Sequence, residues 1–591
     1  MGLYCRKDKG NYQRFVMIKK ILNGEINSIT LAAAMVAFFS LVSRLLGIFR
    51  DRILASEFGA GDTLDIYYAA FRVPDLIFNL LVLGALSAGF IPVFTSLLKH
   101  GKKDERREKF LEKKQNGNEK KDGNAEAWLL ASNILNLLAV SLIILSAIGI
   151  IAAPFLTRLI TPGFSGEKLA LTVSLTRIMF LSPIFLGVSS VLGGILQSFR
   201  RFFIYSLAPV FYNVGIILGA LFLTPFFGVH GLAWGVTLGA LLHMLVQWPS
   251  VRSLGFRYRF ILDWKEKNLR KIMRMMGPRT MSLAITQINL VVLTIIASTL
   301  KSGSLTVFNL ANNLQSFPVG IFGISYAVAV FPTLAREAFH REKLVESFSL
   351  AARQIIFFII PSAVLLLTLR AQIVRVILGS GHFDWEDTIM TIDTLAFFTI
   401  GLLAQALMPL LVRVFYARHD SRTPFYIGLF SVAMNTGLCL WLPKIMSCRV
   451  MFSPFGGVSA CLPLGVAGLA LAFSISSTIN FILLWIYLRM ETGKLDEKRI
   501  LVSTLKIILA SVACGLSVQG LKLVVWPFID MDTFLGVAFQ GLFSGLGGIA
   551  VFLLFCRLLQ SEEFFAFWNS FKRRLPWSKL ETEDKGEARG I

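Results

Sequence analysis

Charged residues are scarce in this chain: Asp, Glu, Lys and Arg make up 16% of its 591 residues, whereas a soluble domain carries roughly 25%. The shortage extends over nearly the whole length, while hydrophobic residues reach 55%. This distribution excludes a soluble enzyme with a single membrane anchor. It predicts a protein that lies within the membrane along most of its length.

Cysteine and histidine are also rare, with six of each, and they form neither a Cys-x-x-Cys pair nor a Cys/His metal spacing. We therefore expect no metal site and no cofactor. Walker loops, His-Glu-x-x-His pairs and nucleophile elbows are missing too, so we expect a protein that is not an enzyme. Cys448 and Cys461 lie in one predicted outer loop, where they either pair in an oxidising compartment or stay as two thiols.

Long apolar segments are what the chain has instead. A helix needs about 20 apolar residues to cross the hydrocarbon, and such segments recur from Ile29 to Cys556. They are uninterrupted rather than alternating, which favours helices over barrel strands. We expect an all-α polytopic membrane protein with about fourteen spans: 29–50, 65–98, 127–153, 170–197, 203–225, 228–249, 276–300, 304–334, 348–370, 388–416, 422–443, 465–488, 500–525 and 533–557.

The formal net charge of +23 would suggest a nucleic-acid partner in a soluble protein. In a membrane protein, Lys and Arg gather in cytoplasmic loops. Here they gather in the predicted inner loops, at 102–107, 200–201 and 252–274, and they are missing from the outer loops near 226–229 and 526–532. We therefore expect no nucleic acid, and both termini in the cytoplasm.

An internal repeat divides the chain. Gly228–Ala233 resembles Gly465–Ala470, and Phe90–Phe94 resembles Val330–Leu334, at offsets of 237 (468 minus 231) and 240 (332 minus 92). Two similar six-helix lobes imply a central cavity, as in alternating-access transporters. The expected parts are a basic tail 1–28, a lobe 29–250 with a charged loop 99–126, a linker 251–275, a lobe 276–490, two extra helices 491–560 and a cytoplasmic tail 561–591.

Charges inside the spans are the informative residues, because each costs roughly 2.5–3.5 kcal/mol on insertion scales. Arg44 and Arg50 lie on the first span, six residues and about 120° apart around a helix. Their long side chains can still reach one wide cavity. Asp65 opens the second span, and Arg72 lies two residues before Pro74.

Guanidinium groups bind phosphate oxygens through two hydrogen bonds. A cationic cavity in a membrane therefore suits an anionic substrate, and a lipid diphosphate is a candidate. These considerations do not name the lipid.

A family resemblance supplies a name. Ser43–Asp51 resembles the opening SRxLGxxRD of the MurJ (MviN) lipid II flippases. The similarity continues through Phe58–Gly61, Asp65, Ala70–Pro74 and Gly84–Phe94, and again at Phe415–Pro424, which resembles the FYAxxDxxTP loop.

This family belongs to the multidrug/oligosaccharidyl-lipid/polysaccharide exporter superfamily. The resemblance implies two six-helix lobes around a cationic cavity, with two extra helices beside a groove for the lipid tail. It implies a flippase that moves the undecaprenyl diphosphate-linked peptidoglycan precursor to the outer leaflet. By position, Arg44 and Arg50 would hold the diphosphate, and Asp65 would help to gate the site or balance charge.

The sequence departs from the family pattern at several charged positions. Many members carry an Arg-Arg pair where this chain has Phe78-Asn79, and Glu-Gly where it has Leu83-Gly84. Many carry Asp-Arg where it has Asn312-Asn313. Arg72 could compensate for a lost cation. Asn313 could offer an amide to sugar hydroxyls, or bond between helices.

Other functions remain open at this stage. The alternatives are a flippase for another polyprenyl-linked glycan, an ion-coupled exporter of the same superfamily, and a non-transporting scaffold. The expected partners are a lipid-linked diphosphate glycan, membrane lipids and cell-wall synthesis enzymes. We expect a monomer in the bacterial inner membrane.

Overall fold

The computed structural model of the chain describes residues 29–83, 89–98, 125–446 and 465–572. Helices account for nearly all of these residues, and no strand occurs among them. In lipid the backbone has no outside hydrogen-bond partner, so apolar segments of this length satisfy it within helices. The prediction of an all-α membrane protein is confirmed. The expected features in 1–28, 99–124 and 573–591, and the Cys448–Cys461 question, lie outside the described residues.

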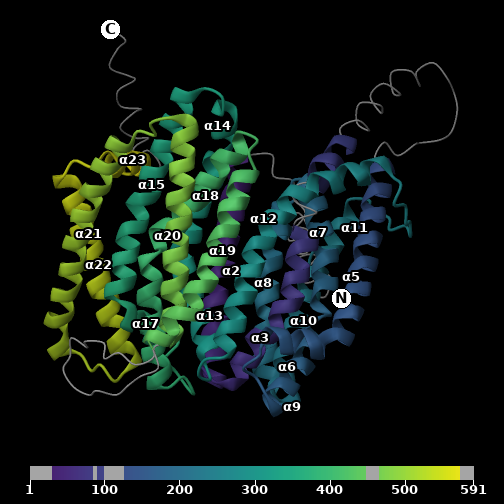
Figure 1. Cartoon of the computed structure of the whole chain (residues 1–591), viewed down its shortest axis with the longest axis horizontal. Helices are drawn as coiled ribbons and strands as arrows, with labels where there is room; N and C mark the ends of the chain where they lie inside the picture. Colours follow the sequence, from purple (N-terminus) through teal and green to yellow (C-terminus); the bar gives the residue numbers. More distant parts are fainter. Residues whose placement is uncertain (1–28, 84–88, 99–124, 447–464, 573–591) are drawn as a thin grey trace, which may run out of the picture. The chain divides into compact units, whose positions relative to one another are not determined.

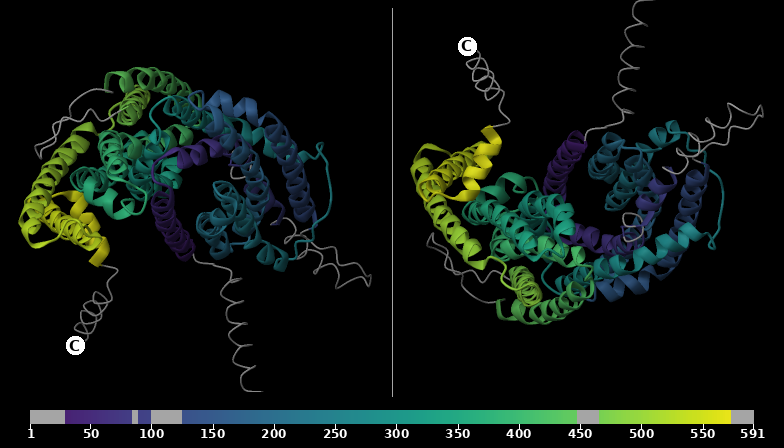
Figure 2. Two further views of the ribbon diagram at one scale, coloured as in Figure 1. Left: turned by 90° about the horizontal axis from the view of Figure 1, so that it is seen from below. Right: turned by 90° about the horizontal axis from the view of Figure 1, so that it is seen from above.

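The chain divides into two compact units, Met1–Thr306 and Val307–Ile591. The predicted lobe boundaries differ from this division and stay a prediction. Within each unit the long helices run side by side (Figure 1), and Figure 2 shows them close to end-on. Unit 1 contains α2 (Ile29–Phe58), α3 (Asp62–Phe78), α5 (Ala125–Ile160), α6 (Gly166–Met179), α7 (Ser182–Ser198), α8 (Phe202–Leu218), α9 (Thr224–Phe227), α10 (His230–Leu245), α11 (Trp248–Ser253) and α12 (Lys267–Ser298).

The second half of the chain is built in the same way. The boundary between the units falls inside α13 (Ser304–Pro318). The helices that follow are α14 (Ser325–Glu337), α15 (Arg341–Thr368), α16 (Arg370–Ile377), α17 (Trp385–Ile400), α18 (Leu402–Ala417), α19 (Arg422–Met446), α20 (Gly465–Thr492), α21 (Glu497–Val525), α22 (Phe534–Leu558) and α23 (Glu562–Lys572).

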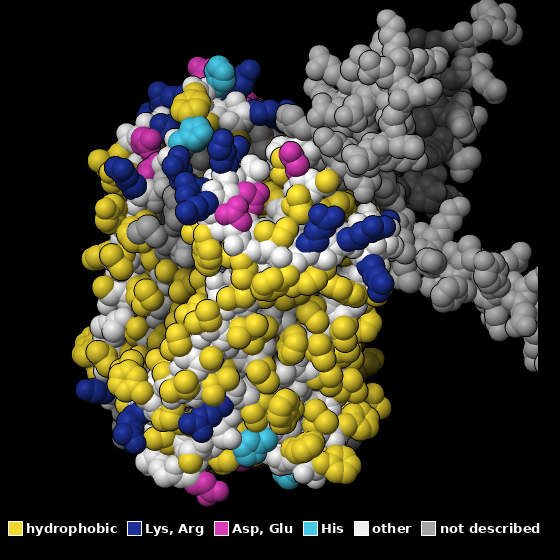
Figure 3. Space-filling model, turned by 90° about the vertical axis from the view of Figure 1, so that its right-hand side faces the viewer, with side chains coloured by type: hydrophobic (Ala, Val, Ile, Leu, Met, Phe, Trp, Pro, Cys, Tyr) yellow, Lys and Arg dark blue, Asp and Glu magenta, His cyan; other side chains and the backbone are white. Residues whose placement is uncertain are grey.

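Ten helices within the described residues are long and apolar enough to cross a membrane, and α17 with α18, bent by 46°, would make an eleventh. The other three predicted spans coincide with α2, α3 and α12, of which Ala284–Ser298 is a shorter apolar stretch. The described helices are therefore compatible with fourteen spans without establishing that number. On the face in Figure 3, a belt of hydrophobic side chains separates two ends where charged side chains gather, as membrane-spanning helices require.

The repeat seen in the sequence corresponds to a repeated helix contact. Gly231 on α10 lies so close to the end of the preceding helix that an added Cβ would be 2.4 Å from the Thr224 nitrogen. Gly468 on α20 is placed in the same way, with Pro443 nitrogen 2.9 Å from such a Cβ. In both halves, glycine lets a helix pack directly on the backbone of its predecessor.

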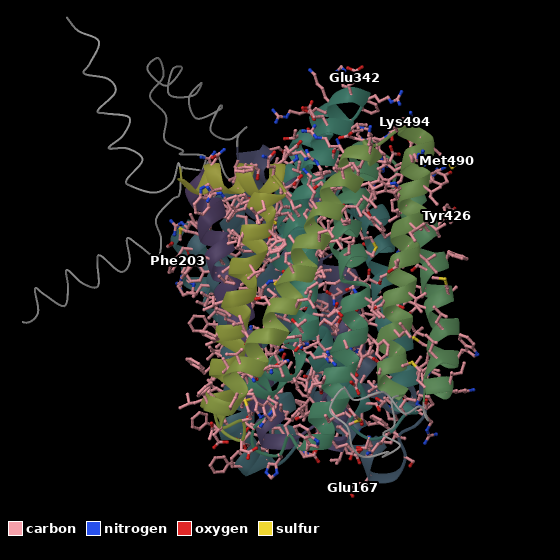
Figure 4. All side chains as sticks on the ribbon, turned by 90° about the vertical axis from the view of Figure 1, so that its left-hand side faces the viewer. Glu167, Phe203, Glu342, Tyr426, Met490 and Lys494 are labelled. Carbon is pink, nitrogen blue, oxygen red and sulfur yellow. The ribbon has the colours of Figure 1, made fainter. Side chains whose placement is uncertain are left out.

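The helices of unit 2 pack around a hydrophobic core in which Phe348, Phe357 and Phe415 are almost fully buried. Glu342 at the start of α15 and Lys494 in the loop before α21 lie near one end of this unit (Figure 4). At the same end, α23 is tied to α15 by Arg353, which is 4% exposed and donates to Glu563 at 2.7 Å.

Candidate functional site

Unit 1 contains a cavity of about 770 Å³ whose wall is formed by α2, α3, α7, α8 and α10, together with residues 82, 91 and 247. Three charged side chains line it: Arg44 and Arg50 from α2 and Asp75 from α3. Their formal charge is +1, from two arginines and one aspartate. The rest of the wall mixes hydroxyl, amide and aromatic groups with apolar side chains such as Phe71 and Leu186.

Arg50 is held by two neighbouring side chains. Its Nε and Nη2 donate to Oδ1 of Asp51, at 3.1 and 2.8 Å, and its Nη1 donates to Oδ1 of Asn213 at 3.1 Å. The Arg50 side chain is 21% exposed and that of Asp51 is 6% exposed. A guanidinium has five N–H groups, so two of them remain available to an anion in the cavity.

Arg44 also faces this cavity, but it makes no hydrogen bond or ion pair with the described residues. Arg44 and Arg50 thus both reach one cavity, although their directions on α2 differ by about 120°. An unpaired cation in surroundings of low dielectric constant attracts an anion strongly. We call the part of the cavity that Arg44 and Arg50 line the cationic region.

The contact between α2 and α8 places these arginines. Asn213 is 7% exposed, and its amide nitrogen donates to the Ser43 carbonyl at 3.4 Å and to the Pro209 carbonyl at 3.1 Å. Gly47 lies next to this amide, since a Cβ added there would be 3.8 Å from Asn213 Oδ1, an ordinary van der Waals distance. Asn213 was not among the residues predicted from the sequence, although an amide in an apolar helix is a recognisable sign of a helix–helix contact.

Asp65 does not line the cavity. It is 2% exposed, and its carboxylate accepts hydrogen bonds from the backbone N–H of Gly303 at 2.8 Å and of Thr306 at 2.9 Å. The Thr306 hydroxyl donates to it at 2.8 Å, and Lys168 Nζ lies 3.5 Å away. The carboxylate thus holds the loop after α12 and the start of α13 against the start of α3, and its predicted part in gating or charge balance stays a prediction.

The other two predicted site residues also lie elsewhere than on the cavity wall. Arg72 donates through Nε to the hydroxyl of Thr294 on α12 at 2.9 Å. Asn313 is half-buried on α13 in unit 2, where its carbonyl accepts from the Ser316 hydroxyl at 2.9 Å. The structure therefore brings together only Arg44 and Arg50 of the five predicted substrate-binding residues. The binding role of all five stays a prediction.

Two of the departures from the family pattern can be located. Phe78 lines the cavity, so this chain has an apolar ring where many members of the family that its sequence resembles carry an arginine. Asn312 accepts from the Gln315 amide at 3.0 Å, and the same amide donates to Gln405 at 3.0 Å. These amides bond between helices within unit 2. The side chain of Leu83 lies outside the described residues.

Asp75 lines the cavity as well, although it was not among the site residues predicted from the sequence. It directly follows Pro74 within an apolar run, and this position could have identified it.

Among the described residues, no group of His, Cys, Asp or Glu is arranged to hold a metal ion.

Long apolar helices and a positively charged cavity define a multi-pass membrane transporter. The family model described as lipid II flippase MurJ matches residues 54–539. The chain belongs to this family, as the motifs in its first two spans had predicted.

Curated relatives agree with this assignment. The chain is 30% identical over 455 residues to the probable lipid II flippase MurJ of Buchnera aphidicola subsp. Acyrthosiphon pisum, covering 76% of this chain and 81% of the relative. It is 28% identical over 464 residues to the lipid II flippase MurJ of Burkholderia cenocepacia, covering 77% and 82%.

Solved structures support the same fold. A lipid II flippase MurJ in an inward closed conformation matches with a TM-score of 0.68 and 23% identity, over 89% of this chain and 98% of that one. An inward-facing MATE-family multidrug transporter of the MOP superfamily matches with a TM-score of 0.59 and 19% identity, over 77% and 96%. At these identities the likeness concerns the fold alone.

Proposed function

We propose that this chain moves lipid II, the undecaprenyl diphosphate-linked peptidoglycan precursor, from the inner to the outer leaflet of the bacterial inner membrane. Membership of the MurJ family supports this substrate. The observation that carries the proposal is the cationic region, in which Arg44 has no counter-ion among the described residues and Arg50 keeps two free N–H groups. A diphosphate would satisfy both side chains.

The proposed mechanism is alternating access. The headgroup enters the cavity and places its diphosphate between Arg44 and Arg50, while the polyprenyl tail stays in lipid, where it needs no protein partner. Opening of the cavity to the other side then releases the headgroup. The chain acts as a transporter, with no covalent step.

The placement in the membrane follows from charge. The loops at 199–201 and 254–266 are rich in Arg and Lys, and such loops favour the cytoplasmic side. We infer that both termini are cytoplasmic. The cavity wall comes from one unit of one chain, which supports a monomer as the transporting form. Cell-wall synthesis enzymes remain expected partners.

The test is complementation in a bacterium depleted of its own lipid II flippase. Wild type, Arg50→Ala and, as a matched control, Arg270→Ala are compared at equal membrane levels; Arg270 is exposed on α12. We expect rescue by wild type and Arg270→Ala and failure of Arg50→Ala. Rescue by Arg50→Ala would remove Arg50 from the mechanism. Failure of the well-expressed wild type would favour another polyprenyl-linked glycan, in keeping with Phe78 on the cavity wall.

Asp75 favours a second candidate, ion-coupled export, because an exporter of that kind needs an acid in its cavity to bind the coupling cation. Asp75→Asn separates the two functions. In a diphosphate-lipid flippase it raises the formal charge of the lining from +1 to +2 and preserves or strengthens binding of the anionic lipid. In an ion-coupled exporter it abolishes transport.

A further inference from the structure

The same cavity has a second region without charge. Ser189 and Gln197 on α7, Tyr205 and Ser206 on α8, and Gln247 after α10 line it. We call these five residues the neutral region. Ser189 lies in the middle of α7, and the other four lie near the end of α7, the start of α8 and the end of α10. Figure 1 shows these three helices within unit 1.

Gln247 carries an unused acceptor in this region. The residue is 1% exposed, and its Nε2 donates to the Ser189 hydroxyl at 2.6 Å and to the His243 carbonyl at 3.1 Å. These bonds fix the orientation of the amide, because the opposite orientation would set Oε1 against a carbonyl oxygen. Oε1 itself is buried and accepts no hydrogen bond from the described residues. Because a buried acceptor without a hydrogen bond costs free energy, a donor from a ligand in the cavity would stabilise it.

Ser206 repeats the pattern from another helix. It is 6% exposed, and its hydroxyl has no hydrogen-bond partner within the described part of the chain. Gly193 keeps space open beside Gln247, since a Cβ there would lie 3.2 Å from Gln247 Oε1 and 3.2 Å from the ring of Tyr205. One wall of the cavity thus contains two polar groups without a hydrogen-bond partner in the described residues, Gln247 Oε1 and the Ser206 hydroxyl, beside the ring of Tyr205 and the space at Gly193.

We propose that the neutral region binds the sugar next to the diphosphate of a lipid-linked glycan. A sugar brings hydroxyl donors for Gln247 Oε1 and Ser206 Oγ, and an apolar ring face for Tyr205. Because the region is uncharged, it does not compete with Arg44 and Arg50 for the diphosphate. The cavity volume of about 770 Å³ lies in the range of roughly 300–1,000 Å³ that is typical of ligand pockets. This inference rests on the proposed function and adds to it the recognition of the sugar.

The test compares two ligands that share the polyprenyl diphosphate, of which only lipid II carries the sugars and their peptide. The full-length purified protein in lipid nanodiscs is titrated with lipid II and with undecaprenyl diphosphate. The variants are Ser206→Ala, Gln247→Met and, as a control off the cavity wall, Ser198→Ala, whose hydroxyl donates to the Gly194 carbonyl at 2.9 Å. Ser206→Ala removes a hydroxyl without a partner, so it leaves folding intact even if Gln247→Met does not.

We expect Ser206→Ala and Gln247→Met each to weaken lipid II binding by about two- to tenfold, the value of a hydrogen bond to a neutral group. Their affinity for undecaprenyl diphosphate should match that of the wild type, and Ser198→Ala should bind both ligands normally. Equal losses for both ligands, or none for either, would overturn the sugar site and indicate that water satisfies these groups.

The wild-type titrations separate this inference from the proposed function. Tight binding of both lipids with equal affinity would leave the diphosphate site standing and refute the sugar site. Binding of neither lipid would refute the proposed function, and the sugar site with it.

Discussion

Arg50 on α2 donates to the side-chain oxygen of Asn213 on α8 at 3.1 Å, across 163 residues of sequence. The same oxygen faces Gly47, one turn earlier on α2. The amide nitrogen of Asn213 donates back to the backbone of Ser43. One neutral side chain therefore fixes both the contact between the helices and the direction of a guanidinium that lines the cavity.

Replacing this amide by a carboxylate should weaken both the helix contact and the binding of an anion. Asn213→Asp keeps an acceptor for Arg50 but loses the amide donor to the Ser43 and Pro209 carbonyls, so the melting temperature should fall. Affinity for undecaprenyl diphosphate should fall by at least about tenfold, because like charges repel strongly in surroundings of low dielectric constant. Lipid titration and thermal unfolding of the same preparation test this prediction. Unchanged affinity would mean that the diphosphate does not approach Arg50.

The buried carboxylate of Asp65 predicts an effect on stability. Asp65→Asn turns one acceptor oxygen into an NH₂ group that faces a donor, either the Gly303 N–H or the Thr306 groups. We expect the free energy of unfolding to fall by about 1.5–3 kcal/mol, the usual value of a hydrogen bond to a charged group. Asp62→Asn is the control, since the Asp62 side chain is 58% exposed. Equal melting temperatures for both variants would contradict this account.

Glycines at the contact between α10 and the residues directly after α8 predict intolerance of even a methyl group. A Cβ on Gly235 would lie 2.7 Å from the Gly219 Cα, which is backbone and has little freedom to move. Gly235→Ala should therefore cost about 1–3 kcal/mol of stability through overpacking. Gly437→Ala on α19 is the matched control, because a Cβ there meets nothing within 4 Å. There the better helix propensity of alanine should make the change neutral or slightly stabilising. Thermal unfolding in detergent measures both variants.

The attachment of α23 predicts a loss of stability in acid. Hydrogen bonds from Arg499 and Arg353, at 2.8 and 2.9 Å, hold the pKa of Glu562 below its ordinary value of 4.5. A lowered folded-state pKa means that the unfolded chain binds the proton more readily. The contribution of Glu562 is thus complete above pH 4.5 and disappears as the pH falls through the lower folded-state pKa.

Melting temperatures measured between pH 7 and pH 3.5 check this. Glu562→Gln should show a shallower decline than the wild type, by a small amount, because the Glu562 side chain is 59% exposed. Glu342→Gln, at the same end of unit 2, should decline like the wild type. A wild-type decline identical to that of Glu562→Gln would exclude the pairing as a source of stability.

Some features of the site follow from local sequence alone. The helical period puts the directions of Arg44 and Arg50 about 120° apart, and the length of the arginine side chain allowed the prediction that both could still reach one wide cavity. Their depth in an apolar run identified them as costly and therefore informative. Asp65 was recognised as important by the same reasoning, but its partners at 303 and 306 are 238 and 241 residues away, and no local pattern indicates them.

The sequence by itself determined the helical membrane fold, the positions of most spans and the basic loops. Each of these depends on the length and polarity of a single segment, because every span must satisfy its own backbone in lipid. Only the tertiary structure decided which polar groups meet: Asn213 beside Arg50, Asp75 on the cavity wall, and Gln247 and Ser206 without partners. These relationships depend on how helices that are distant in sequence pack against one another. A side chain reaches only a few ångströms, so its partners are determined once the helices are packed.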